Sequence, residues 1–296
     1  MTDANSTVGM LSCLSTLALI NVSGADRFTF LQGQLTNDVT KLSDGLMAAG
    51  YCSPKGRLLA TPRLFQDGES IGMIVAASQA EALVKRLKMY VLRSKVTIEL
   101  DLNREVIGFI GKRPENLPAG ALIFDLPAAR VETRIAAALP DGLGLAVVNK
   151  DSVSCSCPPA LWWAACAGAG QPWVFAQSSD RFTPHAVNLD LVRGISFNKG
   201  CYTGQEVVSR IEHIGKTNRR TIVLAADKPL QLEPGADLLS ESGEVVATVL
   251  YCATLSDRSI LLAEVPTSVA ETNASVEIEQ TALHRLGLPY GWTRTE

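Results

Sequence analysis

One short stretch of the chain combines a cysteine, a lysine and residues that typically begin a helix. Residues 199–206 read Lys-Gly-Cys-Tyr-Thr-Gly-Gln-Glu, which places Cys201 two residues after Lys199. The run from Thr203 to Glu206 fits the capping box S/T-x-x-E, so we expect a helix with Thr203 as its N-cap. A helix N-terminus and a nearby ammonium both favour thiolate over thiol, which indicates a reactive cysteine. The alternative is a small buried cysteine in a glycine-rich turn, because free cysteines mostly fill cores.

Other candidate catalytic and metal-binding residues are sparse. The three histidines, at 185, 213 and 284, form no H-x-x-x-H pair, and we expect them to be structural. A pairing of Cys201 with His185 or His213 would suit nucleophilic catalysis, but spacing alone does not establish it. The seven cysteines are scattered, odd in number and without zinc spacing. The sequence therefore predicts no metal site and no disulfide framework, and it favours a reducing compartment.

Four segments carry, in order, the motifs of one known family. They are residues 24–26 (Gly-Ala-Asp) with 32–39 (Gln-Gly-Gln-Leu-Thr-Asn-Asp-Val), 51–59 (Tyr-Cys-Ser-Pro-Lys-Gly-Arg-Leu-Leu), 184–197, and 197–206 (Phe-Asn-Lys-Gly-Cys-Tyr-Thr-Gly-Gln-Glu). On these motifs the chain resembles the YgfZ group of folate-binding proteins. That group includes an iron–sulfur assembly factor and is related to the aminomethyltransferase (T-protein) of glycine cleavage.

The resemblance implies an α+β fold of the aminomethyltransferase type, with ferredoxin-like lobes around a central folate-binding cavity and a C-terminal β-barrel. We place the folate-binding domain at residues 1–218 and the barrel at residues 219–296. The implied function is a folate-binding accessory protein for assembly or repair of iron–sulfur clusters in client enzymes, including tRNA-thiomethylating ones. Cys201 and Lys199 would be the working residues. Tetrahydrofolate or a one-carbon derivative would be the cofactor, and iron–sulfur client or assembly proteins the partners.

The resemblance also supplies candidate cofactor-binding residues. They are Trp162, Gln34, Asn37, Asp38, Tyr202, Gln205 and Glu206. Trp162 stands eight residues before the Gly-Gln-Pro of residues 170–172, where the family carries a folate-contacting tryptophan, but a buried tryptophan serves equally as core packing. The polar residues at 34, 37 and 38 can bond a pterin edge or simply cap a helix.

Two positions depart from the family patterns. Leu17 stands where the family has its other folate tryptophan. Ala60 stands where aminomethyltransferases carry the aspartate that acts near the folate N5 atom. Without that carboxylate the folate ring has no obvious acid or base. A tetrahydrofolate-dependent aminomethyl or methyl transferase using another base is the alternative function, and Ala60 argues against it.

Composition and charge narrow the remaining possibilities. With 296 residues, 47% apolar and 19% charged, the chain suits about two soluble globular domains. The net charge of −3 does not favour nucleic-acid binding, so direct tRNA binding is a disfavoured third hypothesis. The basic residues at 210–220 are typical of a solvated face. Residues 10–20 are too short to span a bilayer and are expected to form a loop entering a strand. We expect no membrane association and a cytoplasmic location.

Local patterns predict the elements in outline. Strands are expected at 17–22, 47–52, 57–65, 71–76, 95–100, 106–110 and 144–148, with helices after Asp26 and at 79–90, 128–139, 161–169 and 203–213. After residue 215 the pattern predicts no further helix but closely spaced strands at 221–226, 243–251, 259–264 and 275–280, typical of a small barrel or sandwich.

Overall fold

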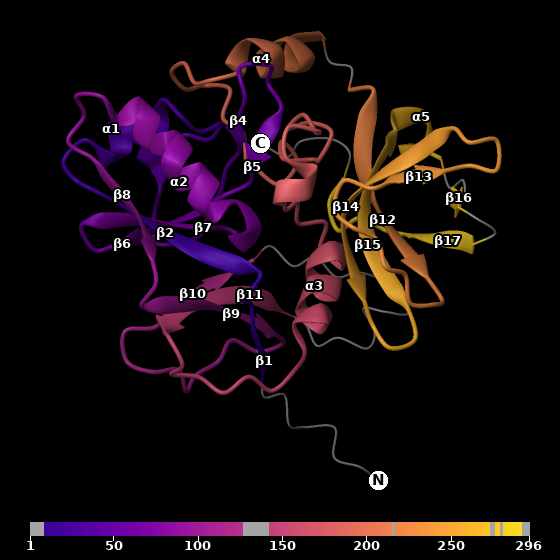
Figure 1. The fold of residues 1–296 in the computed structure, drawn as a ribbon, viewed down its shortest axis with the longest axis horizontal. Coiled ribbons are helices and arrows are strands. Elements are labelled where there is room, and N and C mark those ends of the chain that lie inside the picture. Colours follow the sequence, from indigo (N-terminus) through magenta and orange to yellow (C-terminus); the bar gives the residue numbers. More distant parts are fainter. Residues whose placement is uncertain (1–8, 127–141, 215–216, 273–275, 279–280, 292–296) are drawn as a thin grey trace.

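The computed structural model describes residues 9–126, 142–214, 217–272, 276–278 and 281–291 (Figure 1). Two antiparallel sheets and a strand pair form the N-terminal part, and a third antiparallel sheet forms the C-terminal part. The helices of the described ranges are α1 (Arg27–Gln32), α2 (Ala77–Val91), α3 (Pro159–Gly168), α4 (Gln205–Ile214) and α5 (Thr267–Ala270). The predicted helix at 128–139 falls outside the described residues.

The first sheet has five strands and is covered by α2. Its order is β3 (Met47–Ala48), β6 (Arg63–Asp67), β7 (Ser70–Ala76), β2 (Leu17–Ser23) and β8 (Thr97–Asp101). In α2, the residues Ala80, Leu83, Val84 and Leu87 are buried. This i, i+3, i+4, i+7 spacing gives one apolar face, which packs against β2, β7 and β8. The predicted helix at 79–90 is confirmed.

The second sheet lies beside the first and packs against α3. Its order is β1 (Met10–Cys13), β9 (Arg104–Ile110), β11 (Leu143–Asn149) and β10 (Leu122–Asp125). The sequence predicted a loop at residues 10–20, but residues 10–13 form β1, because Met10 to Cys13 pair in register with Ile110 to Ile107. A long-range partner of this kind leaves no local signal in the sequence.

Helix α3 joins the second sheet to the C-terminal sheet. It contacts β1, β9 and β11 on one side and β14 and β15 on the other. Six of its residues, including Trp162, Trp163 and Cys166, are buried. A helix that is apolar all round is expected in a core, so α3 lies inside the molecule rather than on its surface (Figure 1).

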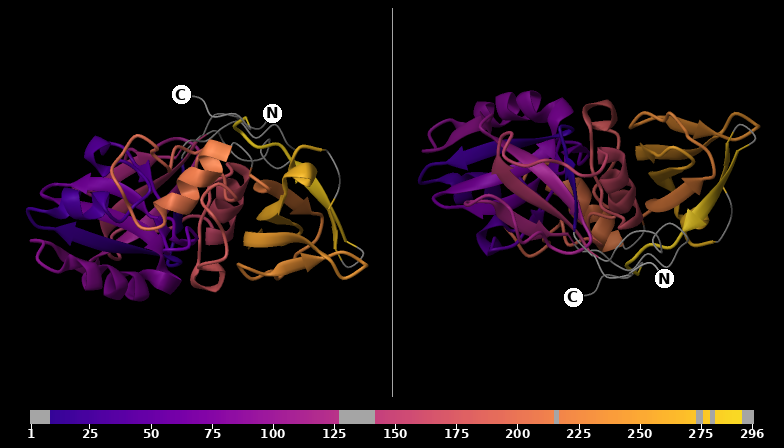
Figure 2. Two further views of the ribbon diagram at one scale, coloured as in Figure 1. Left: turned by 90° about the horizontal axis from the view of Figure 1, so that it is seen from above. Right: turned by 90° about the horizontal axis from the view of Figure 1, so that it is seen from below.

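The C-terminal sheet has six strands and curls into a half-barrel (Figures 1 and 2). Its order is β13 (Asp237–Leu239), β14 (Val245–Thr254), β15 (Ser259–Pro266), β12 (Arg219–Ala226), β17 (Thr281–Leu286) and β16 (Val276–Ile278). The expectation that no helix follows residue 215 is wrong, since the short α5 comes directly after β15. It contacts β12 and β15, which explains why one turn of helix forms there.

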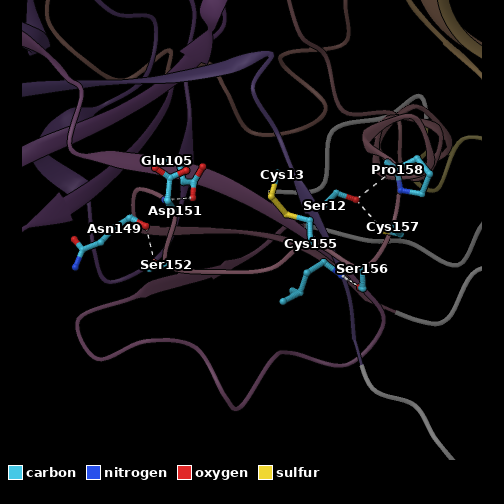
Figure 3. The surroundings of a disulfide bond; sticks show 11 residues. Ser12, Cys13, Glu105, Asn149, Asp151, Ser152, Cys155, Ser156, Cys157 and Pro158 are labelled. Atoms are coloured by element: carbon cyan, nitrogen blue, oxygen red, sulfur yellow. Dashed lines mark hydrogen bonds between the residues drawn. A yellow bond between two sulfur atoms is a disulfide. The ribbon is translucent and has the colours of Figure 1, made fainter.

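One disulfide links β1 to the loop before α3 (Figure 3). Cys13 is bonded to Cys155, 142 residues further along the chain. The sequence analysis predicted no disulfide framework and did not anticipate this single bond. The same loop is attached to β1 by hydrogen bonds between Leu11 and Ser156: each backbone N–H of the pair finds an acceptor in the other residue.

Candidate functional site

The helix after the cysteine motif begins later than the capping box predicts. Helix α4 starts at Gln205 and not after Thr203. Gly204 has φ +83, a left-handed conformation that a helical residue cannot adopt. Cys201 therefore lies four residues before the first helical residue, one more than the capping box implies. The predicted activation of Cys201 by the helix N-terminus stays a prediction.

Tyr202 and Gln205, which lie on either side of Gly204, close the turn with two hydrogen bonds. The Tyr202 N–H donates to Gln205 Oε1 at 3.3 Å, and the Gln205 N–H donates to the Tyr202 carbonyl at 3.2 Å. Glu206, the expected capping carboxylate, instead pairs with Arg210 at 2.8 Å on the exposed side of α4. Gln205 is thus a structural residue of the loop, and Glu206 points into solvent.

A close approach between two turns holds α4 in place. The turn at 53–56 joins β4 (Tyr51–Cys52) to β5 (Leu58–Ala60) and faces the start of α4. A Cβ on Gly204 would lie 2.5 Å from the Ser53 carbonyl oxygen, and one on Gly56 would lie 2.6 Å from Val207 Cβ. Both glycines also have positive φ. The two glycine motifs therefore meet in space, although 148 positions separate Gly56 from Gly204 in the chain.

Lys199 is turned toward the segment that follows α1. Its Nζ donates to the carbonyl oxygens of Gln32 at 2.6 Å, Leu35 at 2.6 Å and Asn37 at 2.9 Å. Three hydrogen bonds use every proton of the ammonium group. Burial lowers the pKa of Lys199 to about 8, partly opposed by the negative charge of Asp38. Lys199 thus fixes the motif loop to residues 32–38, and this differs from the predicted role of tuning the Cys201 thiol.

The ring of Tyr202 also belongs to the junction between the motif loop and residues 32–38. It is buried, and Lys199 Nζ lies 5.1 Å from its centroid, within the range of a cation–π contact. Burial raises the pKa of the Tyr202 hydroxyl. The residue therefore remains a neutral phenol at neutral pH, packed beneath the lysine.

The polar residues of the 32–38 segment mostly bond to the protein itself. Asn37 Nδ2 donates to the carbonyls of Ala48 at 2.7 Å and Arg193 at 2.8 Å. Asp38 accepts from Thr40 at 2.6 Å and from Gln32 at 2.9 Å. The Thr40 hydroxyl bond is the main reason that the pKa of Asp38 is lowered. The side chains of Asn37 and Asp38 therefore stabilise the conformation of this segment.

Gln34 differs from its neighbours. Its Oε1 atom is buried and has no hydrogen-bond partner among the described residues. A buried acceptor without a donor is costly. Of the predicted cofactor-binding residues, Gln34 is the one with a buried side-chain atom that has no hydrogen-bond partner among the described residues.

Trp162 lies apart from this junction, in the core. Its ring is 0% exposed, and its Nε1 donates to the Gly144 carbonyl at 3.0 Å. A Cβ on Gly108 of β9 would lie 2.4 Å from the Trp162 ring, so the strand is shaped to receive it. Of the two roles that the sequence left open, the structure supports core packing. Leu17, at the other tryptophan position, is also a buried core residue.

Ala60 is buried at the end of β5 and carries no ionisable group. Its neighbourhood is the apolar core of the first sheet. Ala60, at the position where aminomethyltransferases carry a carboxylate, is therefore a core residue in this chain.

The cysteines differ sharply in access. All seven lie in described residues, and of the five that are free only Cys201 is exposed. Burial raises the pKa of the Cys52 thiol to about 12 and that of Cys166 to about 11. His185 Nε2 lies 3.3 Å from Glu212 Oε2, so the carboxylate, rather than Cys201, is the partner of this histidine. Within the described ranges no group of three His, Cys, Asp or Glu side chains could hold a metal ion.

One unusual residue escaped the sequence interpretation. Arg63 on β6 is 1% exposed, and its Nε has no hydrogen-bond partner within the described part of the chain. Its guanidinium donates to the Pro172 carbonyl at 3.0 Å and lies 4.7 Å from the Trp173 ring. Burial lowers its pKa to about 10. The only signal for this buried arginine in the sequence is that it stands directly before the apolar pair Leu64 and Phe65.

Comparison with solved structures defines the class of fold. The chain superposes on the glycine cleavage system aminomethyltransferase T from Bartonella henselae with a TM-score of 0.68, covering 97% of this chain and 88% of that one at 16% identity. This confirms the predicted α+β fold of the aminomethyltransferase type. A search of protein-family models finds no match.

Sequence comparison then gives the family. The chain is 33% identical over 310 aligned residues to tRNA-modifying protein YgfZ of Escherichia coli strain K12 and of Shigella flexneri, covering 95% of this chain and 93% of each relative. The chain therefore belongs to the YgfZ family, as its motifs predicted. Across the described ranges no helix has the length and apolar character needed to cross a membrane.

Proposed function

We propose that this chain is a folate-binding accessory protein that supports assembly or repair of iron–sulfur clusters in client enzymes and acts through Cys201. The family relation supports a role connected with tRNA modification, because the relatives are named for it. We therefore place the clients among iron–sulfur enzymes that thiomethylate tRNA, together with cluster-assembly proteins, and the chain in the cytoplasm.

The position of Cys201 carries the proposal. It is the one exposed free thiol among seven cysteines, all of which are described. Its loop is fixed on one side by Lys199 and on the other by the closed turn of Tyr202 and Gln205. An accessible thiol on a fixed loop can exchange with a disulfide, ligate iron transiently as a thiolate or form a covalent intermediate. All three uses need access and a defined position.

We further propose that tetrahydrofolate or a one-carbon derivative binds beside the 32–38 segment. The unpaired buried Oε1 of Gln34 fits this group, because a pterin ring presents N–H donors. Asn37 and Asp38, already bonded to the protein, would shape the pocket rather than carry the recognition. When bound, the folate supplies a carrier for one-carbon units.

The folate proposal is tested by calorimetric titration with tetrahydrofolate. Gln34→Leu should weaken binding about ten-fold or more, since a lost buried hydrogen bond costs about 1–3 kcal/mol. Gln177→Leu is the matched control, because Gln177 is exposed elsewhere and should bind as the wild type does. Absence of binding by the wild-type protein would reject the folate role and leave the role of Cys201 standing.

The role of Cys201 is tested in an Escherichia coli strain that lacks YgfZ, with methylthio groups in tRNA measured by mass spectrometry. Wild-type protein and Cys157→Ser should restore the modification, while Cys201→Ser should not. The Cys201→Ser protein should keep the wild-type unfolding midpoint, because the side chain is exposed. Full restoration by Cys201→Ser would overturn the proposal, and loss of folding would show that the cysteine is structural.

A further inference from the structure

The C-terminal end of α2 presents a surface that the proposed function does not use. It consists of the exposed side chains of Lys85, Lys88, Met89, Tyr90, Leu92, Arg93 and Lys95, which we call the α2-end surface. Figure 2 shows α2 and α4 on opposite sides of the N-terminal part, so the helix that carries this surface lies apart from the helix that follows the motif loop. It can therefore be altered without touching Cys201.

The charge of the α2-end surface is opposite to that of the whole chain. Its four cations stand within eleven residues, 85–95, that contain no Asp or Glu, whereas the chain carries a net charge of −3. Within the described residues, none of these four side chains forms an ion pair. Cations near a helix C-terminus are favoured by the helix dipole, but the dipole gives no reason for the apolar side chains between them.

Those apolar side chains are unusually open to solvent. Leu92 is 87% exposed, Met89 is 61% exposed and Tyr90 is 39% exposed. Large exposed apolar side chains that cluster together commonly mark interaction sites. Residues Tyr90 to Ser94 also line a shallow hollow of about 580 Å³ that is open to solvent.

Leu92 adds an independent observation, because its backbone is strained. It ends α2 with φ 45 and ψ −102. Helices usually place glycine at such a position, since a side chain with a Cβ is disfavoured at positive φ. A bulky leucine that is both strained and exposed contributes nothing to the isolated fold. Strain of this kind is found at sites that act on something else.

We propose that the α2-end surface is a docking site for an acidic protein segment that carries an apolar side chain. The cations would attract the acidic residues, and the apolar side chain would enter the hollow against Tyr90 and Leu92. Protein fits better than RNA, because the two most exposed apolar side chains, Leu92 and Met89, are aliphatic, and on this surface only Tyr90, 39% exposed, offers a ring on which a base can stack. It fits better than a lipid surface, because a flat surface fills no hollow. This inference does not rest on folate binding or on Cys201.

The test measures fluorescence anisotropy of a labelled peptide of Glu and Asp with one central Leu, titrated with the full-length protein. Binding should weaken with added salt and when the central Leu of the peptide is replaced by Ser. Leu92→Gly should weaken it about ten-fold, the size of one interface anchor. This variant removes the strain, so its thermal unfolding midpoint should equal or exceed that of the wild type. The double variant Lys88→Glu/Arg93→Glu should abolish binding.

Matched controls keep the result interpretable. Leu102 is 73% exposed in another turn, and Leu102→Gly should bind the peptide as the wild type does. Lys228→Glu changes an exposed cation in the C-terminal part and should also have no effect. Undiminished binding by Leu92→Gly would overturn the proposal. Tighter binding of a uridine-rich RNA or of anionic phospholipid vesicles, lost in the same variants, would overturn it in favour of those partners.

Discussion

Breaking the disulfide between Cys13 and Cys155 is expected to destabilise the protein chiefly through its unfolded state. The bond joins residues separated by 142 positions, so it closes a long loop in the unfolded chain. The chain-entropy relation for a loop of that length gives about 5 kcal/mol at 25 °C. In the folded state the same segments stay joined by hydrogen bonds between Leu11 and Ser156. The native structure should therefore persist while the free energy of unfolding falls by up to about 5 kcal/mol.

This loss matters for the proposed cytoplasmic location, where thiols are kept reduced. The assay is urea and thermal unfolding of the wild type and of Cys13→Ser/Cys155→Ser, each with and without dithiothreitol. The double variant should unfold roughly 10 °C below the oxidised wild type. Reductant should lower the midpoint of the wild type to that of the variant and leave the variant unchanged.

Cys157→Ser is the matched control. Its sulfur lies in the same loop, 2.9 Å from the Ser12 hydroxyl, but outside the disulfide. It should respond to reductant as the wild type does. Equal stability of oxidised and reduced wild type would refute the entropy argument. Loss of the near-ultraviolet circular dichroism of the reduced protein under native conditions would refute the claim that the folded state persists.

Four further predictions concern the packing around Lys199, around Gly56 and in the core. Replacing Lys199 by Met removes the donor from three carbonyls and should cost about 2–4 kcal/mol in urea unfolding. Because burial lowers the pKa of Lys199 from 10.5 to about 8, the unfolded chain binds more protons between these values. The stability of the wild type relative to Lys199→Met should therefore rise as pH increases from about 8 to about 10.5. Trp162→Ala should lose about 3–5 kcal/mol by leaving a cavity, measured the same way. Gly56→Ala should lose about 1–3 kcal/mol, because its new methyl group meets Val207. Gly68→Ala, at a similar φ in open space, should lose less.

The sequence predicted well whatever depends on neighbouring residues. The periodic apolar positions of α2 follow from the contacts that this helix makes along one face, and the C-terminal strands are recognised from apolar runs such as that of β14. The family motifs added the aminomethyltransferase-type fold, which no local pattern contains. Predictions failed where a long-range contact decided the outcome. The pairing of β1 with β9 and the bond between Cys13 and Cys155 connect segments about 100 or more positions apart, and neither has a local signature.

The site was predicted in composition but not in arrangement. The sequence placed Lys199 beside Cys201 because they are close in the chain, yet the lysine side chain reaches carbonyls more than 160 positions away. It proposed a capping box at Thr203, but the positive φ of Gly204, set by contact with the 53–56 turn, delays the helix. Trp162 could not be assigned from the sequence, since a core tryptophan and a stacking tryptophan look alike until burial is known.

Inside the motif, the residues divide into those that build the loop and those that the loop leaves open. Lys199, Gly204 and Gln205 each make a contact that a different side chain would break. Gly200 and Cys201 do not: a Cβ at Gly200 would meet nothing within 4 Å, and Cys201 is exposed. Packing therefore gives no reason for the identity of the two tip residues, and this agrees with the proposal that Cys201 acts on a molecule outside the chain. Gly200→Ala and Cys201→Ser should both unfold at the wild-type urea concentration. A lower midpoint for either would mean that the tip is part of the packing and would remove this argument for Cys201.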